Sequence, residues 1–198
     1  MPGEIDKNAV RKRFGRSLAT YNGAAEVQRE MAGTLLDLFT SATLERQFAE
    51  ITELGCGAGI LTDLIPERFD YARLTLIDLV PECAQFHEHR PNAHFLAGDI
   101  EEIDLPESGL FLSNAVFQWA ADPGRLFGRI AEKLNRGGYL AFTTFGPETL
   151  REVSALTGGG LAYRTAKELN VLLEANGFEV LAAREELLTP EFDSPLDV

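Results

Sequence analysis

Cysteine is scarce in this sequence: only Cys56 and Cys83 occur among 198 residues. Two cysteines are too few for the disulfide framework of a small secreted protein, and they fit a reducing compartment. Long apolar runs are missing as well, because no stretch approaches the roughly 20 residues that cross a bilayer. The charged N-terminus is followed by no apolar segment of the kind found in a secretory signal. We therefore expect a cytoplasmic protein that does not enter a membrane.

Basic residues are few beside acidic ones. The chain has 18 Lys and Arg against 31 Asp and Glu, a formal net charge of -13, which argues against non-specific nucleic-acid binding, since that needs a basic surface. The exception is the N-terminus, where residues 1–16 hold five basic and two acidic side chains, a net charge of +3. The five basic residues are Lys7, Arg11, Lys12, Arg13 and Arg16. A basic segment beside an acidic body either serves a function or arises by chance.

Neither a metal site nor an activated nucleophile is indicated. His87 and His89 form an isolated His-Glu-His with no cysteine nearby, so we expect them at the surface and expect no metal. Cys56 lies inside a glycine-rich turn, where we expect a packing role. Ser113 has no paired histidine to activate it.

Helical and strand patterns alternate along the chain, which favours an α/β fold with a parallel sheet covered by helices. We expect one domain, 1–198, made of an N-terminal helical cap (1–45), a core (46–145), and lid helices with the last strand (146–198). The expected strands are 51–54, 74–77, 93–97, 110–112, 139–144 and a sixth that begins at 178–181. The expected helices are 24–40, one that stops near Pro66, a short one opened by Pro81, one from Asp122-Pro123 to Gly137-Gly138, one opened by Pro147, and one from a Thr165–Glu168 capping box to Gly177.

The strongest local motif is the glycine-rich turn Glu53-Leu-Gly55-Cys-Gly57-Ala-Gly59, which follows the strand at 51–54. Glycines at a strand-to-helix turn let the backbone approach a ligand closely, at the strand ends where open α/β sheets bind ligands. The third glycine comes one residue earlier than in the dinucleotide fingerprint G-x-G-x-x-G. A carboxylate at Glu53 would repel a pyrophosphate and would suit a ligand with a cationic amine and a sulfonium. The alternative is a purely structural turn.

Two further acids end the next two strands. Asp78 follows Gly59 by 19 residues, at the position where a carboxylate accepts both hydroxyls of an adenosine ribose. Asp99 could accept the adenine exocyclic amine while Ile100 packs on the ring. The alternatives are a helix cap for Asp78 and an exposed turn for Asp99. Three acids at successive strand ends are more specific than any one of them.

These motifs, with Leu134-Asn-Arg-Gly-Gly138, resemble the ordered motifs of class I methyltransferases over about residues 49–145, although Arg136 stands where proline is usual. The resemblance implies a Rossmann-like sheet with helices on both faces, and S-adenosyl-L-methionine as the cofactor of the 46–145 core. It also implies a sixth strand and a seventh, antiparallel strand. No strand-like run follows residue 191, so we expect the C-terminal strand to be missing and the chain to be truncated relative to the family.

A narrower resemblance covers nearly the whole chain. Its segments Phe14–Tyr21 with Ala24–Gln28, Ser113–Trp119, Thr143–Arg151 and Asp193–Asp197 resemble BioC, the family of malonyl-carrier-protein O-methyltransferases of biotin synthesis. The resemblance implies methyl transfer to the free carboxylate of a malonyl thioester, held by an acyl carrier protein or as malonyl-CoA. It places Tyr21 and Gln28 over the cofactor. The cofactor contacts that we expect are Gln28, Glu53, Gly55, Gly57, Asp78, Leu79, Asp99, Ile100 and Asn114.

The acceptor side should need alignment and a counter-charge rather than a base, because a malonyl carboxylate is already ionised at pH 7. Arginine suits the counter-charge through bidentate geometry, and Arg151 and Arg164 are the candidates. Tyr21 could donate a hydrogen bond to the carboxylate, and Gln118 and Trp119 are expected to line the methyl-transfer pocket. Each has a plain alternative: solvated arginines, a packing tyrosine, a core tryptophan.

The basic residues of the N-terminus would dock an acidic carrier protein, or form a solvated helix face. Three other functions compete with the main interpretation. They are a methyltransferase for another small carboxylic acid, a nicotinamide-dependent reductase, and a non-catalytic protein that binds S-adenosylmethionine. The glycine spacing argues against the reductase, and the preserved acids and glycines argue against a decayed pocket.

Overall fold

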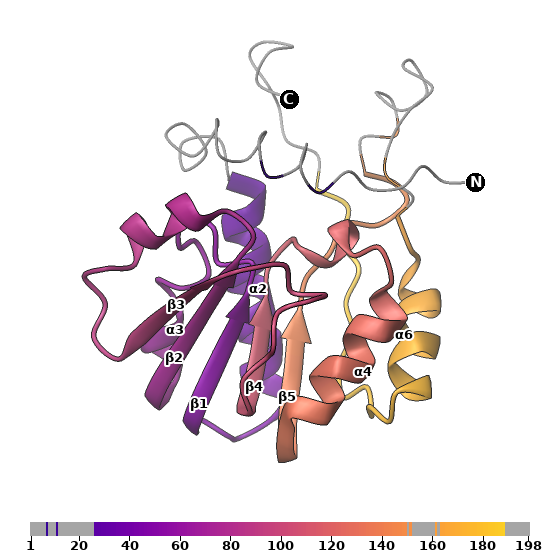
Figure 1. Ribbon diagram of the computed structural model, residues 1–198. Helices are drawn as coiled ribbons and strands as arrows, with labels where there is room; N and C mark the ends of the chain where they lie inside the picture. Colours follow the sequence, from indigo (N-terminus) through magenta and orange to yellow (C-terminus); the bar gives the residue numbers. More distant parts are fainter. Residues whose placement is uncertain are drawn as a thin grey trace.

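Five parallel strands form one sheet in the order β3-β2-β1-β4-β5, with helices on both faces (Figure 1). This computed structural model describes residues 7, 11, 26–149, 151, 161 and 163–188. The strands are β1 (Gln47–Leu54), β2 (Asp70–Asp78), β3 (Ala93–Ala97), β4 (Ser108–Ser113) and β5 (Leu134–Phe142). The helices are α2 (Glu26–Ala42), α3 (Ile65–Arg68), α4 (Pro123–Lys133) and α6 (Ala166–Ala175), with 3-10 turns η1 (Pro81–Phe86) and η2 (Phe117–Trp119). None of the helices described is long and apolar enough to cross a membrane.

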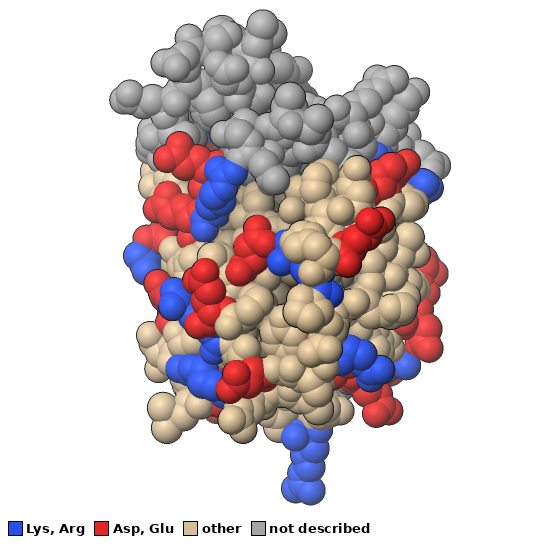
Figure 2. Space-filling view, turned by 90° about the vertical axis from the view of Figure 1, so that its left-hand side faces the viewer, with Lys and Arg blue, Asp and Glu red and all other residues tan. Residues whose placement is uncertain are grey.

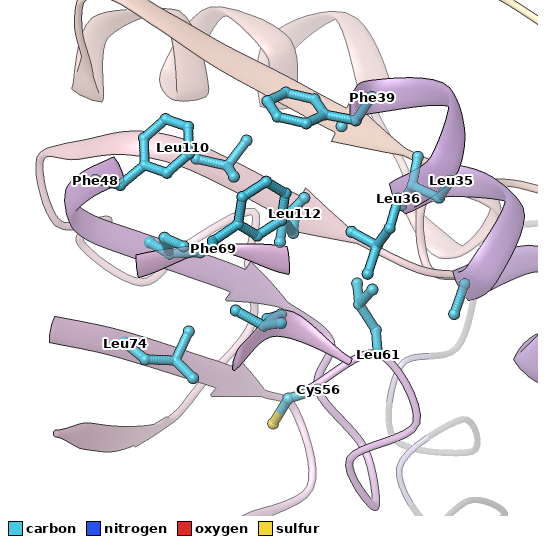
Figure 3. Close-up of a cluster of buried hydrophobic side chains, with 14 of the residues drawn as sticks. Leu35, Leu36, Phe39, Phe48, Cys56, Leu61, Phe69, Leu74, Leu110 and Leu112 are labelled. Atoms are coloured by element: carbon cyan, nitrogen blue, oxygen red, sulfur yellow. The ribbon is translucent and has the colours of Figure 1, made fainter. Parts of the chain in front are cut away.

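The sheet buries an apolar layer on each face, because side chains alternate along a strand. On one face, Leu36 and Phe39 of α2 pack against the strands (Figure 3). Leu110 and Leu112 of β4 point to this side, and Phe111 between them points to the other. The second layer is completed by α4 and α6, which lie together across the opposite face (Figure 1).

Three of the expected helix starts are confirmed, those of α4, α6 and η1. Asp122 caps α4, since its carboxylate accepts a hydrogen bond from the backbone N–H of Arg125 at 2.9 Å. Thr165 and Glu168 form the capping box of α6, each side chain accepting the other's backbone N–H. Such caps satisfy N–H groups that have no partner within the helix. Pro81 opens η1 as expected.

Other expectations about local structure were wrong. Pro66 lies in the first turn of α3 instead of ending a helix, a position where its missing N–H costs nothing. The helix that begins after Asp122 ends at Lys133, and the Gly137-Gly138 pair lies within β5. The helix expected from Pro147 is not among the wrong expectations, because it falls largely outside the described residues: 147–149 form a turn and Arg151 is helical.

The sixth strand expected at 178–181 is not formed in the part of the chain that the structure describes, where 178–188 have no strand pairing. Phe178 and Val180 pack instead against the apolar layer beside α4 and α6. Phe178 meets Phe127 edge to face at 6.5 Å between ring centroids. The apolar pattern of this segment therefore serves packing rather than strand pairing.

Candidate active site

A pocket opens at the carboxyl ends of β1, β2, β3 and β4. Its empty volume is about 1100 Å³, including space open to solvent. It lies where the strand order reverses from β1 to β4, the usual place for ligands in open parallel sheets. Ten of the residues expected from the sequence line it: Gln28, Glu53, Gly55, Gly57, Asp78, Leu79, Asp99, Ile100, Asn114 and Trp119.

The backbone N–H groups of the glycine-rich turn are used within the protein, in hydrogen bonds to the end of β2. Gly55 and Cys56 both donate to the carbonyl of Ile77, at 2.7 and 3.1 Å, and Gly57 donates to Asp78. A turn that binds pyrophosphate uses such N–H groups for the ligand. Gly57 has a φ of +51° with no atom within 4 Å of where a Cβ would stand, so backbone alone borders the pocket there. These contacts argue against a dinucleotide site.

Asp78 is held rigidly at the end of β2. One carboxylate oxygen accepts the N–H of Gly57 and the other accepts that of Val80, both at 2.8 Å. The Cys83 thiol is a third hydrogen-bond partner of this carboxylate. Burial raises the pKa of Asp78, and these three hydrogen bonds oppose the rise. A carboxylate has about four acceptor sites, so one remains for a hydroxyl of a ligand, and a second hydroxyl would replace the thiol.

Glu53 is the most buried acid of the pocket, with 1% of its surface exposed. Its carboxylate accepts a hydrogen bond from the hydroxyl of Thr62 at 2.7 Å. Burial raises the pKa of Glu53 from 4.5 to about 8. A cationic group of a ligand would favour its ionised form, so this end of the pocket suits a positive charge.

Asp99 and Glu101 form a second acidic pair, at the end of β3. Asp99 accepts the backbone N–H of Glu101 at 3.0 Å on one oxygen and the ammonium of Lys7 at 2.6 Å on the other. Lys7 also forms an ion pair with Glu101. Neither Lys7 nor Glu101 was expected here from the sequence, since only the fold brings residue 7 to this strand end.

His87 corrects the expectation of a surface histidine, because it is 4% exposed. Its Nε2 donates to the carbonyl of Gly57 at 3.0 Å, and its Nδ1 accepts from Nε of Arg90 at 3.2 Å. Burial lowers the pKa of His87, which keeps the ring neutral. His89 is exposed, as expected. Across the described part of the chain, no three His, Cys, Asp or Glu side chains are grouped to hold a metal.

Cys56 has the packing role expected of it. Its side chain is 3% exposed and belongs to the apolar layer under α2 (Figure 3). Burial raises the pKa of its thiol well above the usual value. A thiol that stays protonated is a poor nucleophile.

The wall after β4 is held by amide side chains. Asn114 donates to the carbonyl of Gln28 at 2.9 Å and accepts from the hydroxyl of Thr143 at 2.6 Å, which ties α2 to the ends of β4 and β5. Gln118 is absent from the pocket lining; it donates to the carbonyl of Ala115 at 2.7 Å. Both residues therefore brace this wall.

Arg151 and Arg164, two candidates for binding an acceptor carboxylate, are not among the residues that line the described pocket. Arg151 is exposed and forms an ion pair with Glu148 at 2.6 Å, and Arg164 is exposed on the segment before α6. Tyr21 lies outside the described residues. The acceptor roles of these three residues stay predictions.

Comparisons with known proteins give a consistent result. A methyltransferase domain family matches residues 24–183. The malonyl-[acyl-carrier protein] O-methyltransferase of Chlorobium luteolum is 40% identical over 98% of this chain and 77% of its own length, and that of Bacteroides thetaiotaomicron is 33% identical over 98% and 75%. The N-methyltransferase NodS of Bradyrhizobium japonicum, solved with S-adenosyl-L-homocysteine, matches in fold with a TM-score of 0.65 at 21% identity, covering 83% of this chain and 84% of that one. The expected Rossmann-like architecture is thereby confirmed.

Proposed function

Because the chain belongs to the family of malonyl-[acyl-carrier protein] O-methyltransferases, we propose that it transfers a methyl group from S-adenosylmethionine to the free carboxylate of a malonyl thioester. The observation that carries this proposal is the 40% identity to a relative of that name over 98% of the chain. Biotin synthesis is the process in which such a methyl ester is used by the family that the sequence resembles. We propose malonyl-acyl carrier protein as the methyl acceptor, with malonyl-CoA as the alternative acceptor.

The residues of the pocket fit S-adenosylmethionine. Asp78 would accept the ribose hydroxyls, since backbone N–H groups orient its two oxygens, and the ligand would use the remaining acceptor site and the one that the Cys83 thiol occupies. Glu53 would face the positive charge of the ligand, which restores the ionised state that burial disfavours. Asp99 and Ile100 would bind the adenine. The N–H groups of the glycine turn are used within the protein, which opposes the rival interpretation, a nicotinamide-dependent reductase.

S-adenosylmethionine, when bound, supplies an electrophilic methyl group on a sulfonium sulfur. The chain needs no general base, because the acceptor carboxyl is ionised near pH 7. Its task is to align the carboxylate and to exclude water, which favours a step that neutralises charge. Trp119 borders the pocket and would shield the acceptor. Arg151, Arg164 or Tyr21 would hold the acceptor carboxylate.

The direct test is methyl ester formation, followed by mass spectrometry. The protein is incubated with S-adenosylmethionine and malonyl-acyl carrier protein, malonyl-CoA, free malonate or a tricarboxylic acid. We expect an ester on the malonyl thioesters and none on the free acids. Esterification of a free acid alone would establish the competing function, a methyltransferase for another small acid. Cofactor binding without any ester would indicate a non-catalytic binding protein.

A pair of variants tests the cofactor site. Asp78→Asn replaces one acceptor oxygen by an N–H donor that opposes a backbone N–H, so affinity for S-adenosylmethionine should fall roughly tenfold or more. Asp70→Asn is the matched control, since Asp70 is exposed at the opposite end of the same strand. Calorimetry that gives both variants the affinity of the unaltered protein would remove Asp78 from the site.

A further inference from the structure

Lys7 reaches the pocket from far away in the sequence. Its ammonium lies 2.6 Å from Asp99 and also contacts Glu101, residues that follow it by 92 and 94 positions. The side chain is 27% exposed, and Lys7 is counted among the pocket-lining residues. Burial alone would lower the pKa of Lys7, but its hydrogen bonds and charge attraction to the two acids raise it. The ammonium therefore stays charged at neutral pH.

The distribution of charge in the pocket explains why a basic residue lies beside Asp99 and Glu101. Four acids line it, namely Glu53, Asp78, Asp99 and Glu101, and Lys7 is the basic lining residue within the described ranges. The first two acids face the end where a cationic amine and the ribose hydroxyls would bind. Asp99 and Glu101 lie at the end assigned to adenine, which is neutral. A neutral ring cannot compensate two carboxylates, so the protein has to supply the cation.

Glu101 extends the contact to the next loop. Its side chain is 7% exposed, and it accepts the backbone N–H groups of Ala121 and Asp122 at 2.9 and 2.8 Å. Asp122 is the cap of α4, and the loop follows Trp119 directly. Lys7 thus joins three segments: its own, the end of β3, and the loop that leads from Trp119 into α4.

We infer that Lys7 is a positioning residue for the cofactor, which orients Asp99 as the hydrogen-bond acceptor for the adenine amine at the end of the pocket that Lys7 lines. The inference rests on the proposed function. The ammonium of Lys7 contacts both carboxylates, so its single positive charge offsets part of the repulsion between Asp99 and Glu101 and fixes the Asp99 side chain in place. The second lone pair of its Lys7-bound oxygen remains available for the ligand.

The test compares Lys7→Gln with Arg11→Gln, which removes the same charge from an exposed residue of the same segment. Calorimetry measures the affinity for S-adenosylhomocysteine and for S-inosylhomocysteine. The ring of the second ligand lacks the exocyclic amine that would donate a hydrogen bond to Asp99. In Lys7→Gln we expect affinity for S-adenosylhomocysteine to fall roughly tenfold, the usual size of a charge-assisted contact. The preference for the adenine form over the inosine form should shrink toward equality. Arg11→Gln should keep both values.

Lys7→Arg separates positioning from folding, because arginine keeps the charge and reaches both acids. It should restore most of the adenine preference that Lys7→Gln loses. Equal losses for both ligands in Lys7→Gln would mean that Lys7 supports only the fold, and unchanged affinities would also overturn the inference. Failure of the unaltered protein to bind S-adenosylhomocysteine would instead refute the proposed function, and the inference with it.

Discussion

Replacing Glu53 by Gln should stabilise the protein while weakening its cofactor site. The side chain is 1% exposed and its pKa is raised by burial from 4.5 to about 8. An acid with a raised folded-state pKa stabilises the fold in its neutral form, and its ionisation destabilises the fold. Stability of the unaltered protein should therefore fall as pH rises from 4.5 to 8 and level off above that. Gln keeps the shape and an oxygen that accepts from Thr62, but carries no charge.

The expected size follows from the pKa difference. At about 1.4 kcal/mol per pH unit, a rise from 4.5 to about 8 costs on the order of 5 kcal/mol above pH 8 and about 3 kcal/mol at pH 7. Urea unfolding of both proteins at pH 5, 7 and 8.5 measures this. The stability gained by Glu53→Gln should be near zero at pH 5 and grow with pH. Glu67→Gln, on the exposed side of α3, is the control and should show no such trend.

The affinity for the cofactor should have the opposite pH dependence and should rise with pH where the stability falls. A cationic amine beside Glu53 favours its ionised form, so affinity of the unaltered protein for S-adenosylmethionine should rise as pH increases from 6 toward 8. Glu53→Gln should bind roughly 10- to 100-fold more weakly, as expected for a lost hydrogen bond to a charged group, and should lose this rise. A variant that is neither more stable at pH 8.5 nor weaker in binding would refute the reasoning about Glu53.

Three other variants address the remaining site residues. His87→Leu leaves the carbonyl of Gly57 without its donor, so stability should drop by about 1–3 kcal/mol in urea unfolding, whereas His89→Leu should change little. Since the pKa of His87 is lowered, its ionisation also destabilises the fold below about pH 6.5, and His87→Leu should lose that part of the pH dependence. Arg151→Lys should raise KM for the malonyl substrate and leave cofactor affinity unchanged, because the planar guanidinium is lost; unchanged kinetics in Arg151→Ala would move the role to Arg164 or Tyr21. A triple alanine variant should raise KM for the carrier-bound substrate but not for a small malonyl thioester, and equal losses on both would exclude docking; its positions are Arg11, Lys12 and Arg16.

Three acids of the site, Glu53, Asp78 and Asp99, were predictable from their places at or just after the ends of strands. Asp78 is the last residue of β2 and Asp99 follows β3 by two residues, and in a parallel sheet all such ends meet at one edge. The glycine turn was predictable for the same reason. Lys7, His87 and Glu101 were missed because their roles depend on contacts across long stretches of sequence, where no periodicity points to the partner.

The failures of local prediction have a related cause. Apolar residues at 178–181 are compatible with a strand or with packing on a helix layer, and the choice depends on which surface is within reach. Phe178 packs against Phe127 of α4, so this segment contributes to the apolar layer and not to the sheet. Pro66 is compatible with either the end or the first turn of a helix, and only the turns before it decide.

The fold also narrows how an acidic carrier protein could be recognised. With the +3 of residues 1–16 set apart, the rest of the chain carries -16. Among the described residues on the face in Figure 2, acidic and basic side chains are interspersed and form no basic patch. The charge of Lys7 is already used by Asp99 and Glu101, so the docking hypothesis loses one of its five cations. What remains must act from Arg11, which is exposed, and from its neighbours in sequence. Charges of that kind act mainly on the association rate. The triple alanine variant tests this. If its rise in KM for the carrier-bound substrate becomes smaller between low and moderate salt, docking by these residues is supported, and a rise that does not depend on salt would exclude it.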